Sequence, residues 1–142
     1  MVYFLDQEIN LTRPACFYTI SSQHRYVRPK EKSKWTVTYE EEVNIFRNSY
    51  SEKWLEGYIC WGLLLNGDNI ILQLGINKFN ENLFISKFID GNKNSKWHGY
   101  PADYKRNLYD RPSVRILSLW KDSGKIEKHH ISKIRCGKKC NL

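Results

Sequence analysis

The chain has 142 residues, of which 41% are hydrophobic and 27% are charged, and this is the size and composition of one globular domain rather than of a disordered segment. It contains no run near the ~18 apolar residues of a membrane helix, and its first residues lack the basic start and small-residue cleavage site of a signal peptide. We therefore expect a cytoplasmic protein without a membrane partner, in which the four cysteines are reduced thiols.

Positive charge is unevenly distributed along the chain, whose formal net charge is +8. Residues 24–34 contain five basic and one acidic residue, residues 93–115 contain six and two, and residues 121–142 contain seven and two. Residues 35–60 have the opposite balance, with two basic and five acidic residues. Charge segregated in this way can form a positive face that attracts polyanions such as nucleic acids. The alternative is a solvated surface that only keeps the protein soluble.

The first predicted elements are a strand and a helix. Residues 15–22, rich in aromatic and β-branched side chains, are typical of a strand, and residues 23–34 form a basic loop. Thr38 and Glu41 have the spacing of a capping box. Apolar residues follow at spacings of three and four, so we predict a helix from residue 39 to about residue 50. The three glutamates of its first turn suit the helix dipole, and we assign no metal site to them.

Three strands and a long polar loop are predicted next. Residues 57–65 and 70–76 flank an Asn-Gly pair at 66–67, which suits the type I′ turn of a hairpin. Residues 82–89 are the predicted third strand of an antiparallel meander. Residues 92–112 have the composition of a polar connection, and ordered loops of this length are often functional.

Two short helices are predicted at the C-terminal end. Asp110 or Arg111 followed by Pro112 suits the start of a helix over residues 113–122. A turn at Gly124 follows, and a second helix runs from residue 127 to about residue 135, ending at Gly137.

The predicted fold is a single α+β domain: an antiparallel sheet of three to five strands with one internal helix and a C-terminal pair of short helices. Trp61 and Trp120 are predicted core residues. The predicted parts of the domain are a core at about residues 15–91, the loop 92–112, the helical pair 113–136 and a basic tail 137–142.

The tract 97–106, with the sequence WHGYPADYKR, contains most of the chemically active side chains of the predicted loop. His98 could transfer protons near neutral pH, aromatic rings such as Tyr100 could stack on bases, and the basic residues could hold a phosphate. His24 in the other basic loop could complete a histidine pair for metal-independent RNA cleavage. The competing interpretation is that Trp97 and Tyr100 fill the core while the glycine and proline shape a turn.

Cys136 and Cys140 are separated by three residues and preceded by His129 and His130, a spacing that occurs in zinc sites. A single cysteine pair lacks the second pair that makes such a pattern specific. We therefore interpret the two cysteines as thiols on a basic tail and predict no metal and no cofactor.

The run from Leu119 to Lys138 resembles part of a helix-turn-helix, and its ending ISKIRCGK, residues 131–138, is similar to the end of the recognition helix in the Cro/C1 repressor family. The resemblance covers about twenty residues, and Gly124 stands about one residue farther from the ending than in the family pattern. It implies that Lys125, Lys128, His129, His130 and Lys133 face DNA. The alternative, which we favour, is an αα-hairpin that covers one face of the sheet.

The sequence most favours a small basic protein that contacts nucleic acid, and it favours binding over catalysis without deciding between them. The predicted contact residues are Arg25, Arg28, Trp97, His98, Tyr100, Tyr104, Lys105, Arg106, Lys128, Lys133, Arg135 and Lys138. One alternative is a non-enzymatic protein-binding module, such as an immunity or inhibitor protein that caps an acidic partner. The other is a small metal-independent ribonuclease that uses His98 and His24.

Overall fold

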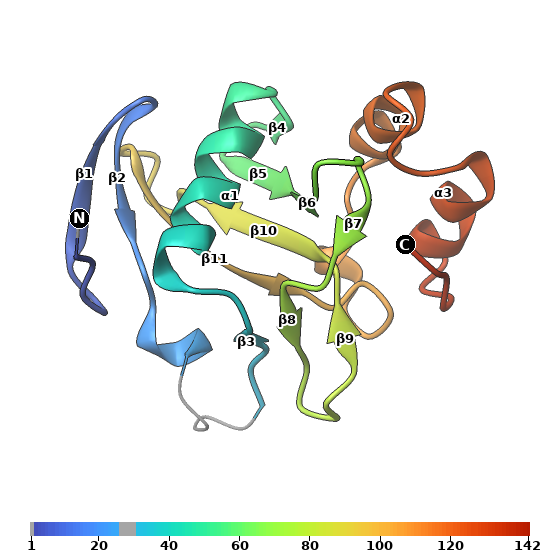
Figure 1. The fold of residues 1–142 in the computed structure, drawn as a ribbon, viewed down its shortest axis with the longest axis horizontal. Helices are drawn as coiled ribbons and strands as arrows, with labels where there is room; N and C mark the ends of the chain where they lie inside the picture. The colour runs from blue at the N-terminus through green and yellow to red at the C-terminus, as the bar shows by residue number, and fades with distance from the viewer. Residues whose placement is uncertain (1, 26–30) are drawn as a thin grey trace.

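The computed structural model describes residues 2–25 and 31–142 and has a mixed α+β fold (Figure 1). Its main sheet has six strands in the order β1-β2-β11-β10-β5-β4. These strands are β1 (Glu8–Thr12), β2 (Ala15–Thr19), β11 (Lys96–Ala102), β10 (Ile85–Ile89), β5 (Ile59–Gly62) and β4 (Leu55–Glu56). β2 and β11 run parallel, and the other neighbours run antiparallel. The α+β class is confirmed, but the predicted sheet of three to five strands is too small.

Two smaller sheets stand beside the main one. β3 (Lys34–Trp35), β8 (Gly75–Ile76) and β9 (Asn82–Leu83) form a three-stranded sheet, and β6 (Leu64–Leu65) pairs with β7 (Ile71–Leu72). The predicted hairpin across residues 66–67 is confirmed by the antiparallel pairing of β6 with β7, and β8 pairs antiparallel with β9. The predicted third strand is divided between two sheets, as β9 and β10, so the three predicted strands do not form one continuous meander.

The turn between β6 and β7 differs from the predicted type I′ turn. The side-chain oxygen of Asn66 accepts hydrogen bonds from the N–H groups of Asp68 and Ile70, at 2.8 and 3.0 Å. The positive φ falls on Asn69 and not on residues 66–67. A side-chain cap of this kind mimics a backbone turn, which explains why the loop is longer than the Asn-Gly pair predicts.

The segment predicted as a loop contains the central strand β11, which lies between β2 and β10. Gly99 of β11 is opposite Phe88 of β10, and a Cβ on Gly99 would lie 2.2 Å from that ring. Trp97 is buried against Phe46, with 5.5 Å between the ring centroids. The glycine that suggests a turn in the sequence therefore allows close packing inside a strand. The prediction of an irregular loop over residues 92–112 is wrong for β11.

α1 (Tyr39–Ser51) covers one face of the main sheet (Figure 1). Its predicted capping box is confirmed: Thr38 Oγ1 accepts from the Glu41 N–H at 3.1 Å, and the Glu41 carboxylate accepts from the Thr38 N–H at 3.0 Å. The apolar side of the helix, including the fully buried Phe46, packs against Tyr18 and Phe88 of the sheet.

α2 (Val114–Asp122) and α3 (Lys128–Arg135) pack on the opposite face of the sheet. Trp61 of β5 belongs to one apolar cluster with Trp120 of α2 and Ile134 of α3, whereas the adjacent Cys60 belongs to the cluster under α1. Successive residues of a strand point to opposite faces, so the two clusters lie on opposite sides of the sheet. The core positions predicted for Trp61 and Trp120 are confirmed.

The ends of the two C-terminal helices follow local signals. Ser113 caps α2, so the predicted start at Asp110 or Arg111 lies too early and Pro112 precedes the cap. Gly124 and Gly137 have φ values of 78° and 70° and stand at the turn and at the end of α3, as predicted. Two short 3₁₀ helices, Ser22–His24 and Leu108–Asp110, are absent from the predicted arrangement. Within residues 2–25 and 31–142, no helix combines the length and apolar content needed to cross a membrane.

Candidate functional site

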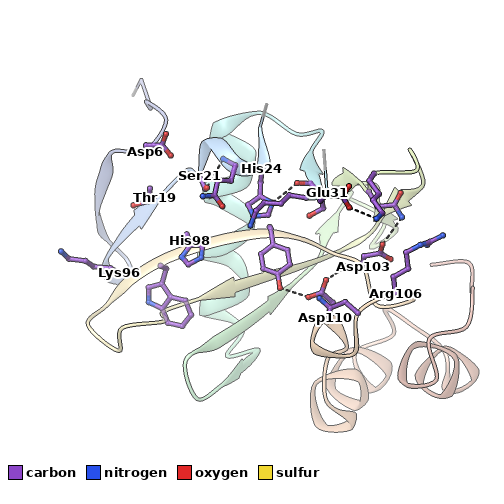
Figure 2. A pocket seen from close by; sticks show the side chains of 18 of the residues that line it. Asp6, Thr19, Ser21, His24, Glu31, Lys96, His98, Asp103, Arg106 and Asp110 are labelled. Carbon is purple, nitrogen blue, oxygen red and sulfur yellow. Dashed lines mark hydrogen bonds and ion pairs between the residues drawn. The ribbon is translucent and has the colours of Figure 1, made fainter. Parts of the chain in front are cut away.

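An open cleft of about 840 Å³ lies over the part of the sheet that α2 and α3 leave uncovered (Figure 2). Lys87 of β10 is opposite both Trp61 of β5 and Tyr100 of β11, and directly opposite residues share a face of the sheet. Because side chains alternate along β11, Lys96, His98 and Tyr100 point to this face. They form the floor of the cleft, next to the α2–α3 cluster that contains Trp61.

His24 enters the cleft from the 3₁₀ helix Ser22–His24 and is held by two contacts. Its Nδ1 lies 2.8 Å from the carbonyl oxygen of Ser33. Its ring stacks on Tyr100, with 5.1 Å between centroids and 16° between planes. A carbonyl oxygen only accepts hydrogen bonds, so Nδ1 bears the proton and the neutral ring has its lone pair on Nε2.

The pKa of His24 is lowered to about 4, mainly because burial removes water from the charged ring. The positive charges of Lys32 and Lys34 lower this pKa further, and so does His98. The Ser33 carbonyl acts in the opposite direction but does not offset the burial. At neutral pH His24 is therefore an uncharged imidazole with a fixed orientation.

A buried polar network holds the hydroxyl group of Tyr100 in place. Tyr100 donates to Asp110 Oδ1 at 2.7 Å, and the N–H of Asp103 donates to the other Asp110 oxygen at 2.9 Å. The buried Lys87 ammonium lies 4.0 Å from the Asp110 carboxylate and donates to the Tyr109 carbonyl at 2.6 Å. Burial raises the pKa of Tyr100 well above its ordinary value, and Asp110 adds to the shift. The phenol therefore stays protonated and remains bonded to Asp110.

His98 stands on the cleft floor without a hydrogen-bond partner among the described residues (Figure 2). Partial loss of water in the cleft lowers the pKa of His98, and the charge of Lys32 lowers it further. The same lysine also affects His24. Two imidazoles and one ammonium group thus face a common space, although they come from distant parts of the chain.

The cleft as a whole is close to neutral. Four lysine and arginine side chains and five carboxylates line it. Glu8 pairs with Lys96 at 3.0 Å, and Glu31 pairs with Lys78 at 2.8 Å. In the described part of the chain, Lys32 has no carboxylate within ion-pair distance. Its charge is therefore available to an anionic ligand.

Five predicted site residues line the cleft: His24, Trp97, His98, Tyr100 and Arg106. The prediction of a nucleic-acid contact is wrong for Trp97, because its ring is buried in the core under α1. It is also wrong for Arg25, whose guanidinium forms a buried ion pair with Glu42 at 2.7 Å. Arg28 lies outside the described residues.

The remaining predicted residues lie along the neighbouring part of the surface. Tyr104 and Lys105 line a second pocket of about 470 Å³, which shares Asn77 and Asp103 with the cleft. Arg135 donates from Nη1 to the carbonyl oxygen of Pro112 at 3.1 Å, so it ties α3 to the start of α2. Lys128, Lys133 and Lys138 are exposed on and after α3.

Sequence patterns alone do not reveal the supporting residues of the cleft. Lys87 and Asp110 sit in segments predicted as a strand and a loop, and no motif joins them. Lys32 and Ser33 are two polar residues among many in a basic loop. If residues 96–102 had been assigned to a strand, its alternation would have placed His98 and Tyr100 on one face. This alternation is the one sequence pattern from which the site could have been predicted.

Cys140 Sγ lies 3.4 Å from the Tyr104 hydroxyl, and all four cysteines are free thiols. In the part of the chain that the structure describes, no group of three or more His, Cys, Asp or Glu side chains is arranged to hold a metal ion.

No protein-family model, no curated protein and no solved structure matches this chain. Functional inference therefore rests on the geometry of the cleft and on the distribution of charge around it.

Proposed function

We propose that the protein binds nucleic acid through the basic side of its C-terminal helical pair, next to the cleft. The observation that supports this is the location of the charge. Residues 113–142 contain eight basic and two acidic residues, in a chain whose net charge is +8. This segment forms α2, α3 and the tail, which lie together at one end of the fold (Figure 1), so its charges are gathered in one basic layer there. A field of this kind attracts polyanions.

The cations of this layer are available to a ligand. Lys128, Lys133 and Lys138 are exposed, and none of them is within ion-pair distance of a carboxylate among the described residues. Contact with phosphate would release counterions from the nucleic acid, and this release supplies most of the affinity in binding that does not depend on sequence.

The second pocket connects the basic layer to the cleft, although Glu81 and Asp103 balance the two lysines that line it. Lys139 of the tail and Lys105 both line that pocket, which adjoins the cleft at Asn77 and Asp103. An extended strand bound along α3 and the tail would therefore reach the cleft. A duplex would contact the protein only through its outer backbone, because the floor of the cleft is a sheet face between loops.

An exposed aromatic ring beside Arg106, which lines the cleft, gives this path a stacking surface. Phe79 is 56% exposed, and the Arg106 guanidinium lies 4.5 Å from its ring centroid. Base stacking on such a ring adds about 1–3 kcal/mol per base and occurs with single strands. Phe79 replaces the buried Trp97 as the expected stacking residue.

Fluorescence anisotropy with labelled single-stranded and double-stranded oligonucleotides, at several salt concentrations, tests this proposal. We expect dissociation constants of ~10⁻⁴–10⁻⁶ M at physiological salt and tighter binding to single strands. The double variant Lys128→Gln/Lys133→Gln should weaken binding. It should also lower the slope of log K against log salt by about one for each phosphate that the variant no longer neutralises.

The matched control is Lys53→Gln/Lys93→Gln, which removes the same charge from exposed positions elsewhere. An equal loss of affinity in the control would mean that binding follows total charge and not the helical layer. Absence of binding at low salt would reject the proposal and leave the protein-binding alternative.

A further inference from the structure

The geometry points to a further activity beside the binding surface: the cleft cleaves RNA, with His24 and His98 as the pair that transfers protons. This inference rests on the proposed function, because the bound strand must be RNA and must reach the cleft. It concerns two side chains that binding alone does not require.

His24 has the properties of a general base. The Ser33 carbonyl fixes its tautomer, so the lone pair is on Nε2, and this nitrogen has no hydrogen-bond partner among the described residues. The stacked Tyr100 ring, itself bonded to Asp110, keeps the imidazole in one plane. With a pKa of about 4, the ring is unprotonated over the whole neutral range, although it is a weaker base than an ordinary histidine. A base held in this way loses little orientational freedom when the substrate binds.

His98 is placed to act as the general acid. It lies on the floor of the same cleft, and the two rings are close enough for the charge of His98 to lower the pKa of His24. Lys32 faces both rings and has no carboxylate partner in the described part of the chain. A phosphodiester bound at Lys32 would bring negative charge to His98, and such a charge favours the protonated imidazole.

The reaction balances without any further reactant. Nε2 of His24 removes the proton of the ribose 2′-hydroxyl, and the 2′-oxygen attacks the adjacent phosphorus. The bond from phosphorus to the 5′-oxygen breaks, and the leaving oxygen takes a proton from His98. The products are a 2′,3′-cyclic phosphate and a 5′-hydroxyl. His24 has then gained one proton and His98 has lost one, and exchange with solvent restores both.

Lys32 would stabilise the extra negative charge that the phosphorus centre acquires in the transition state. DNA and 2′-O-methyl RNA lack the 2′-hydroxyl, so the same cleft would bind them without cleaving them. Comparing RNA with DNA and 2′-O-methyl RNA therefore distinguishes binding from cleavage.

The test uses the whole protein and a labelled single-stranded RNA of mixed sequence at mildly acidic pH, with and without EDTA. We expect cleavage that persists in EDTA and leaves 2′,3′-cyclic phosphate ends, together with intact DNA and intact 2′-O-methyl RNA. His98→Ala, at an exposed position, should lower the rate by at least about 100-fold, the usual minimum for loss of an acid–base group. His24→Ala should do the same.

The matched control is Asn44→Ala, which changes an exposed side chain of α1, away from both the cleft and the helical pair that binds the strand. It should cleave like the wild type. Each protein is purified in the same way, so a contaminating nuclease would give equal activity in all of them. If His24→Ala does not fold, because its buried ring is removed, His98→Ala decides the question alone.

Binding of the 2′-O-methyl RNA, measured on the same proteins, separates the two proposals. Binding without cleavage of the matching RNA overturns the catalytic inference and leaves the binding function in place. Absence of binding to any oligonucleotide rejects the proposed function. Cleavage that His98→Ala retains, or that EDTA abolishes, also overturns the assignment of the histidine pair.

Discussion

The buried ion pair between Arg25 and Glu42 allows a quantitative test of the structure. Arg25 Nη2 lies 2.7 Å from Glu42 Oε1, and Tyr18 donates to the other carboxylate oxygen at 2.6 Å. The two charged side chains are 8% and 0% exposed. The guanidinium also donates to the carbonyls of Val37 and Thr38. Arg25 therefore joins the 3₁₀ helix Ser22–His24 to the start of α1.

The perturbation is Arg25→Met, which keeps much of the apolar stem and removes the charge. Removing one partner of a buried pair leaves the other charge uncompensated and costs about 3–5 kcal/mol. Arg13→Met is the matched control, because Arg13 is exposed and surface changes usually stay within about 0.5 kcal/mol. The double variant Arg25→Met/Glu42→Leu should recover most of the loss, because no buried charge remains.

The stability lost in Arg25→Met should also depend on pH, and the direction of this dependence follows from the pKa of Glu42. Burial raises the pKa of Glu42 to about 7, although Tyr18 and Arg25 both act to lower it. A group whose pKa is higher in the folded state stabilises the fold at low pH, and this contribution is lost as pH rises through the folded pKa. Removing Arg25 raises that pKa further. The difference between variant and wild type should therefore be smaller in mild acid and should grow above neutral pH.

Urea denaturation of the four proteins, at one mildly acidic and one mildly alkaline pH, measures these quantities. The free energy of unfolding comes from the midpoint and slope of each transition. A loss below about 1 kcal/mol for Arg25→Met would mean that the pair is exposed to water in solution. A loss that is equal at both pH values would refute the assignment of the pH dependence to Glu42.

Three further predictions concern the fold. Thr38→Ala should lower the free energy of unfolding by about 1 kcal/mol through loss of the N-cap, and an unchanged denaturation midpoint would contradict this. Trp120→Ala should cost about 3–5 kcal/mol as a large core truncation, so a slight loss would indicate a surface position. In alkylation followed by mass spectrometry, the exposed Cys136 should react rapidly in the native protein. Burial raises the pKa of Cys16 to about 11 and that of Cys60 to about 12, so both should react slowly. After unfolding, all four thiols should react without added reductant.

Local structure was largely predictable from short-range patterns. A capping box needs only Thr38 and Glu41 at the right spacing, and a helix end needs only a residue such as Gly124 or Gly137 that accepts a positive φ. Each of these interactions joins residues a few positions apart, so it can be predicted from the local sequence. The α+β class follows from the same patterns, because they locate helical and extended segments one at a time.

The candidate site was predicted in part. His24, His98 and Tyr100 were recognisable as chemically active residues, but their meeting in one cleft was not. Arg25 and Trp97 have the residue types of nucleic-acid contacts, and their burial could not be read from the loop-like segments that contain them. Burial depends on which distant segment packs against a side chain, and composition does not specify that.

The sequence by itself determined the positions of the three α-helices, the capping box of α1, the glycines that end the C-terminal helices and the concentration of positive charge toward the C-terminal end. Only the tertiary structure decided that residues 96–102 form a central strand, since the parallel pairing of β11 with β2 joins segments about eighty positions apart. That pairing sets which side chains face α1 and which face the cleft. Strand pairing depends on the fit of two distant surfaces, and the energy of that fit exists only once the chain has folded.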